Sequence, residues 1–98
     1  MSAPARVLAS LVDVTLEPPS ADTDAADVLD LAQRMSAERV PLLDELRRVL
    51  TDSALDEECT PLLAVLRERD ARWMSRLIRA QHELQQRVRF ARSHYPTP

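Results

Sequence analysis

Glycine is absent from all 98 residues of the chain. Folds rich in β-strands, and loops that cradle phosphate groups, depend on glycine for positive φ angles and for close approach of the backbone. Rossmann-type dinucleotide binding and P-loop chemistry are therefore excluded. Leucine, alanine, valine, arginine and glutamate dominate instead, and these residues favour helices. The composition predicts an all-α fold in a single domain that spans residues 1–98.

Charge, cysteine content and hydropathy indicate a chain that functions in the cytoplasm. The net charge of −3 favours solubility. Cys59 is the single cysteine and has no partner for an internal disulfide, which fits a reducing compartment. No apolar run approaches the roughly 18 residues that a membrane span requires. The N-terminus also lacks the pattern of a signal peptide. We therefore expect a cytoplasmic protein without a membrane span.

The first predicted element is a short helix over residues 4–16. Ser2-Ala3-Pro4 can cap and open it, with proline at the first helical position. The β-branched run at 12–15 would also suit a strand, so the alternative stays open. Pro18-Pro19 ends the helix, because proline supplies no N–H and disfavours helix in the residue before it. Residues 17–23 then form an acidic linker.

Two long helices follow, each with apolar residues at alternating steps of three and four. The second helix is expected over 24–51, with a kink near Pro41. The third is expected over 54–93, and a later start at Thr60-Pro61 is the alternative, since threonine can cap a helix that opens with proline. Residues 94–98 are expected to fray.

A short connection between the two long helices predicts an antiparallel hairpin. Its helices should bring Leu46 and Val49 close to Leu62, Leu63 and Leu66. The short first helix can cover the remaining face and complete a three-helix bundle. Because an elongated hairpin exposes much of its surface, a partner helix or a homodimer is also compatible with the pattern.

No catalytic, cofactor-binding or metal-binding residue is expected, and the chain does not resemble an enzyme. Cys59, His82 and His94 lie too far apart along rigid helices to form a nucleophilic site. His82 has no second ligand at helical spacing for a metal. A helical bundle of the chorismate mutase type would use inward-facing charges such as Arg39 and Asp70. However, the motif order of that family is missing.

Arg39 and Asp70 are more simply interpreted as a structural ion pair. They occupy apolar stripe positions about one turn apart on facing helices, where a matched pair fixes the register with little net gain in stability. Elsewhere the charges are segregated: residues 13–30 contain six acidic and no basic residues, and 67–92 contain eight arginines against three acidic residues. We expect the acidic segment to fold along the basic helix. Nucleic-acid binding is disfavoured, because the net charge is negative and aromatic residues are few.

Two stretches of the long helices resemble a known family. The first is 38–46, with the sequence ERVPLLDEL. The second begins at Thr60 and places a proline, an apolar run, an acidic residue and a returning apolar heptad at Pro61, Leu62–Leu66, Asp70, and Trp73, Leu77 and Leu84. Over about residues 28–92 the chain is similar to the FliT/FlgN type of flagellar type III export chaperone.

The resemblance implies a small cytosolic helical bundle that guards a filament-cap or hook-junction subunit and delivers it to the export apparatus. Some members also bind a transcriptional regulator. The chain departs from the family in its short first helix followed by Pro18-Pro19, and in Val28, which stands near the position of an early aromatic residue. It also has no counterpart of the C-terminal helix that masks the client groove in some members, so autoinhibition is not implied.

These observations predict a protein that binds an amphipathic helix of an export client in an apolar groove. A helical adaptor or dimerisation module without a link to secretion is the alternative. The third helix is apolar over two adjoining stripes, which one partner helix cannot cover, and arginines rim them. Trp73 could instead fill the core of the bundle. The residues expected to bind the partner are Trp73, Met74, Leu77, Ile78 and Leu84.

Overall fold

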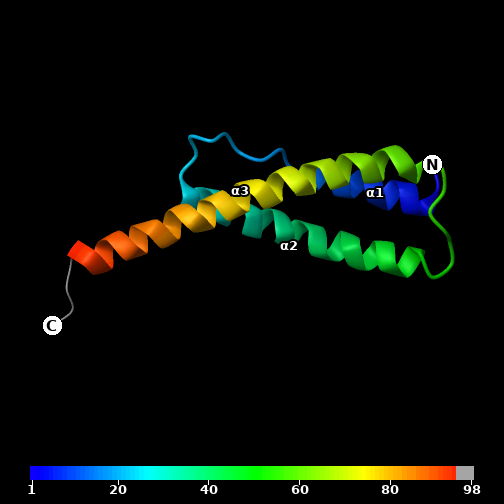
Figure 1. The fold of residues 1–98 in the computed structure, drawn as a ribbon. Helices are drawn as coiled ribbons and strands as arrows, with labels where there is room; N and C mark the ends of the chain where they lie inside the picture. Colours follow the sequence, from blue (N-terminus) through cyan, green and yellow to red (C-terminus); the bar gives the residue numbers. More distant parts are fainter. Residues whose placement is uncertain (95–98) are drawn as a thin grey trace.

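The computed structural model of the protein describes residues 1–94 and contains three helices: α1 (Ala3–Val14), α2 (Ala25–Val49) and α3 (Cys59–His94). The predicted all-α helical bundle is confirmed. In Figure 1, α1 and α3 run in the same direction and α2 runs antiparallel to both, with α1 beside the first half of α3. Of the end expected to fray at 94–98, residue 94 is the last residue of α3, and 95–98 lie outside the described residues.

The connection between α2 and α3 is longer than the sequence predicted. It spans residues 50–58, because α3 begins at Cys59, close to the alternative start at Thr60 rather than at residue 54. Asp56 organises this start: its carbonyl accepts a hydrogen bond from the Cys59 N–H (3.1 Å), and its Oδ1 accepts one from the Cys59 thiol (3.3 Å). A hydrogen bond with Ser2 holds the pKa of Asp56 below its ordinary value, and the Cys59 thiol lowers it further.

Helix α2 continues through Pro41, as its apolar periodicity predicted. Proline cannot donate to the carbonyl four residues earlier, which belongs to Ala37. Both residues are exposed, so water can take the place of the missing donor. At the start of the helix, Asp24 Oδ2 accepts a hydrogen bond from the Ala26 N–H at 3.1 Å and caps the first turn.

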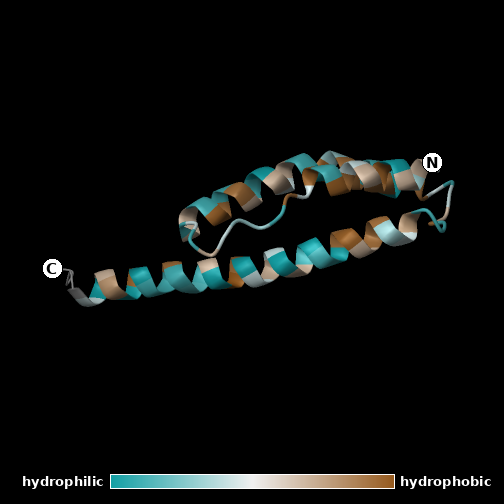
Figure 2. Ribbon diagram, turned by 90° about the horizontal axis from the view of Figure 1, so that it is seen from above, coloured by the Kyte–Doolittle hydropathy of each residue, from teal (hydrophilic) through white to brown (hydrophobic). Residues whose placement is uncertain are grey.

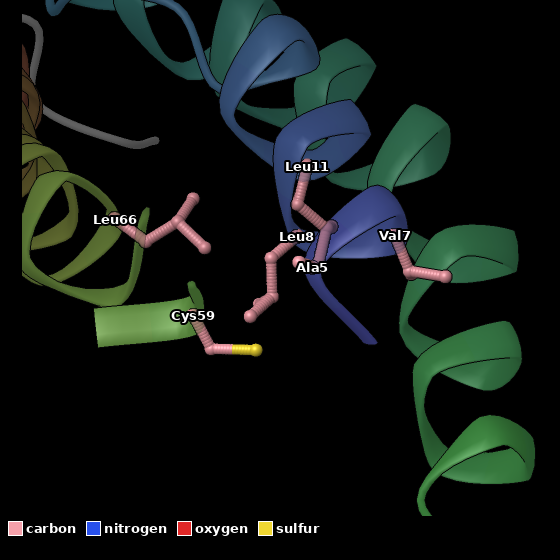
Figure 3. Packing of buried hydrophobic residues seen from close by; sticks show 6 residues of the cluster. All are labelled: Ala5, Val7, Leu8, Leu11, Cys59 and Leu66. Carbon is pink, nitrogen blue, oxygen red and sulfur yellow. The ribbon is translucent and has the colours of Figure 1, made fainter. Parts of the chain in front are cut away.

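One apolar cluster joins all three helices at the end of the bundle nearest the 50–58 loop. Figure 3 shows Leu66 and Cys59 of α3 pointing towards Leu8 of α1, whereas Val7 points towards α2. The contacts predicted for the hairpin are confirmed here, because one set of partly buried residues from α2 and α3 packs against the same cluster. These residues are Leu42, Leu46, Val49, Leu62 and Leu63.

A second cluster lies further along the hairpin, beyond the end of α1. Its buried members come from α2 and α3 and are Ala25, Val28, Met35, Trp73 and Ala80. Because α3 has 36 residues and α2 has 25, their lengths are about 54 and 38 Å at 1.5 Å per residue. Helix α3 therefore extends past the start of α2. Figures 1 and 2 show this largely hydrophilic end projecting without a neighbouring helix.

Candidate protein-binding groove

Residues 15–24, here called the strap, connect α1 to α2 and run along α3 (Figure 1). Their main chain covers Trp73, whose indole Nε1–H donates a hydrogen bond of 2.7 Å to the Leu16 carbonyl. Only 2% of Trp73 is exposed. Trp73 therefore lies in the core, which was the alternative to a binding anchor, and its part in partner binding stays a prediction. Helix α1 is too short to seal this part of α3, as expected, but the strap completes the seal.

Arginines on the same face of α3 hold the strap through its carbonyl groups. Arg69 Nη1 donates to the carbonyls of Val12 and Thr15 at 3.0 and 2.9 Å. Arg76 Nη2 donates to those of Ser20 and Thr23 at 3.3 and 2.8 Å. Helix α1 has no basic residue in its last turn, so Arg69 supplies from α3 the donor and the positive charge that the C-terminus of α1 favours.

Carboxylates of the strap complete these contacts. Glu17 pairs with Arg69 at 3.4 Å and with Arg72 at 2.7 Å, and Asp24 Oδ1 pairs with Arg87 at 2.9 Å. The hydrogen bond from Arg87 lowers the pKa of Asp24, and the capping bond from Ala26 lowers it further. The prediction that the acidic segment folds along the basic helix is confirmed, although carbonyl groups supply many of the contacts.

A groove lies between α2 and α3 on the side of α3 away from the strap. Successive residues of α3 are rotated by about 100° around the helix axis. Arg72, on one side of Trp73, contacts the strap, so Met74, on the opposite side of Trp73, faces away from it. The groove has a volume of about 290 Å³. It is lined mainly by small and apolar side chains and crossed by one pair of charges: Ala32, Met35, Ser36, Arg39, Asp70, Trp73, Met74 and Leu77.

Exposed apolar side chains extend this groove along both helices. Met74 and Ile78 of α3 are each 60% exposed and stand one turn apart. On α2, Val40 and Leu43 follow the groove residues Ser36 and Arg39 by one turn and are also exposed. Met74 also lines the groove, and the other three residues continue it by one helical turn on either helix, so they provide apolar surface that the bundle itself does not bury.

Arg39 and Asp70, the two charged residues predicted to face each other, meet in the groove. Arg39 Nη1 lies 2.9 Å from Asp70 Oδ1, and Nη2 lies 3.4 Å from Oδ2, so the guanidinium approaches the carboxylate with two nitrogens. The side chains are 19% and 46% exposed. Within residues 1–94, Arg39 Nε is buried and has no hydrogen-bond partner. The pair therefore places charge inside a groove that is lined mainly by apolar side chains.

A double-mutant cycle with Arg39→Ala and Asp70→Ala should give an interaction energy of about 0.5–1 kcal/mol. The partly buried arginine raises this value above that of a fully exposed pair. The exposed Arg34–Asp30 pair, one turn apart on α2 at 2.9 Å, is the matched control and should give about 0.3–0.5 kcal/mol. Urea unfolding followed by circular dichroism measures both. A value for Arg39–Asp70 no larger than that of the control would contradict a structural role.

The five residues predicted to bind a partner therefore occupy different environments. Trp73 is buried in the second cluster, and Leu77 and Leu84 are half-buried against it. Met74 and Ile78 are exposed beside the groove. The strap-binding role of Arg69 and Arg76 escaped the sequence analysis, although their spacing of seven residues on one helical face is a signal of a shared role.

Comparison with known proteins yields no matching family model, and no similar curated protein or solved structure. In the part of the chain that the structure describes, none of the helices is both long and apolar enough to cross a membrane. Over the same residues, no three side chains of histidine, cysteine, aspartate or glutamate gather in an arrangement that could hold a metal ion.

Proposed function

We propose that the protein binds an amphipathic helix of another protein in the groove between α2 and α3. The observation that carries the proposal is the exposure of Met74 and Ile78 on α3 and of Val40 and Leu43 on α2, with a groove between the two helices that contains a single ion pair. A helix with apolar residues at steps of three and four would bury these side chains. The Arg39–Asp70 pair would favour one register of the bound helix. A polar side chain of that helix placed at the pair could form hydrogen bonds with it, whereas an apolar side chain at the same place could not.

We further propose that the bound helix belongs to an export client and that the protein is a cytoplasmic chaperone of the FliT/FlgN type. The resemblance of residues 28–92 supports this assignment, and the client would be a filament-cap or hook-junction subunit that the chaperone brings to the export apparatus. In this role the protein acts by binding and not by catalysis. A helical adaptor or a dimerisation module would use the same apolar surface, and the experiments below separate these functions.

The combined substitution Met74→Glu and Ile78→Glu should weaken partner binding at least tenfold. Placing a carboxylate against an apolar partner surface costs more than about 1.4 kcal/mol, which corresponds to a factor of ten in affinity. The partner is first captured from an extract of a motile, export-competent bacterium and identified by mass spectrometry. Its affinity for the purified protein is then measured by calorimetry. Because both residues are exposed, the circular dichroism spectrum and the melting temperature should stay close to those of the wild type.

The control carries two acidic substitutions at exposed positions of the α2–α3 loop, Ala54→Glu and Leu55→Glu, and should bind normally. Equal affinities for the groove variant and the wild type would contradict the proposed site. A captured flagellar subunit, or neighbouring genes for flagellar cap or export components, would support the chaperone. A non-secretory partner would favour the adaptor. A groove-dependent dimer in light scattering would favour the dimerisation module.

A further inference from the structure

A second hollow lies on the strap side of α3 and shares no lining residue with the groove. It has a volume of about 340 Å³. Three arginines, a hydroxyl and one strap residue line it: Arg72, Ser75, Arg76, Arg79 and Pro18. The arginines follow one another at steps of four and three residues, which places them on one face of α3. Such a concentration of guanidinium groups around one hollow has no role in the binding of an apolar helix.

Arg76 is fixed beneath the strap, yet most of its guanidinium has no partner. Its Nη2 donates to the two strap carbonyls, and the residue is only 8% exposed. Among the described residues, Nε and Nη1 of Arg76 are buried without a hydrogen-bond acceptor. Buried donors without acceptors are costly, and a charged donor more so. Because Arg76 lines the hollow, an anion bound there would place its negative charge beside this guanidinium.

Arg72 and Arg79 are more exposed and can exchange their present partners. Arg72 pairs with Glu17 and Glu68, and Arg79 pairs with Glu83. The side chains of the two arginines are 48% and 57% exposed, and pairs of this kind contribute little to stability. Both guanidinium groups can therefore turn towards a ligand in the hollow without a large loss elsewhere.

We propose that this hollow binds the phosphate group of a small soluble phosphate ester. A carboxylate is satisfied by one guanidinium in a two-pronged pair, whereas a phosphate group presents more oxygens and suits several converging arginines. The Ser75 hydroxyl adds a further donor. The positive charge of Arg76, held in place by the strap, lies at the base of the site. Because the hollow and the groove have no lining residue in common, the proposal does not depend on the chaperone function.

Titration with inorganic phosphate, and separately with sn-glycerol 3-phosphate, tests the site at constant ionic strength. Calorimetry measures affinity, and nuclear magnetic resonance follows the side-chain Nε–H signals of the arginines. We expect saturable binding that shifts the signals of Arg72, Arg76 and Arg79. Arg79→Gln should weaken the binding about tenfold, because it removes one charge-assisted contact. Arg92→Gln removes the same charge from an exposed position on the projecting end of α3 and should change the affinity less than about twofold.

Ser75→Ala provides a second variant at an exposed position and should also weaken binding without loss of helix content. The proposal is overturned if neither soluble probe binds saturably, or if Arg92→Gln weakens binding as much as Arg79→Gln. Vesicles that contain phosphatidylglycerol serve as a separate arm. Binding to these vesicles that Arg79→Gln leaves unchanged, without binding of the soluble probes, would show general adsorption to an anionic surface and would also overturn the proposal.

Discussion

Replacing Trp73 with alanine is expected to lower the free energy of unfolding by about 3–5 kcal/mol. The indole is 2% exposed and belongs to the cluster that α2 and α3 form beyond α1. Its removal leaves a cavity that helices fixed in a hairpin can only partly close, and it leaves the Leu16 carbonyl without its donor. Urea unfolding followed by circular dichroism measures the change.

Trp73→Phe is the matched control, because it keeps an aromatic ring in the cluster but removes the indole N–H. We expect a smaller loss of about 1–2 kcal/mol, from the missing hydrogen bond and the smaller ring. The comparison separates packing from hydrogen bonding. Suppose instead that Trp73→Ala had the same urea midpoint of unfolding as the wild type but no longer bound the partner. Trp73 would then be a surface anchor, and the burial described above would be contradicted.

Leu8→Ala should cost about 2–5 kcal/mol, because Leu8 is 1% exposed at the junction of α1 with the hairpin. Leu55→Ala makes the same chemical change at a position that is 48% exposed in the α2–α3 loop, and it should alter stability by less than about 0.5 kcal/mol. Thermal unfolding of both variants tests whether α1 is an integral layer of the bundle. Equal melting temperatures for the two would show that α1 contributes little to the fold.

The helices and their pairing could be predicted because the information is local and periodic. Leucines at steps of three and four define the faces of α2 and α3, and Arg39 and Asp70 stand out as charged residues within those faces. The start of α3 was harder to place, since both Ser53 and Thr60 can cap a helix. The contacts of Asp56 with Cys59 and Ser2 favour the later start. The contact with Ser2 joins residues far apart in the sequence, so local patterns could not reveal it.

The path of the strap could not be predicted in detail. The side chains of α3 donate hydrogen bonds mainly to its main-chain carbonyl groups, and every residue has such a group. The sequence shows which arginines share a face with Trp73, but not that Leu16 and Ser20 present their main chain to that face. Burial of Trp73 follows from this arrangement. Met74 and Ile78, two of the residues predicted to bind a partner, are exposed because they lie on the side of α3 that neither α1 nor the strap covers.

The strap has a consequence for the order of events during synthesis of the chain. Each hydrogen bond between the strap and α3 joins residues that are more than 50 positions apart, from Thr23 with Arg76 to Asp24 with Arg87. The ribosome therefore releases the acidic segment long before its basic counterpart exists. Closing such distant contacts is slow compared with forming local helical turns. The strap can therefore form these hydrogen bonds only after α3 has been synthesised, whereas α1 can already pack against α2 before that point.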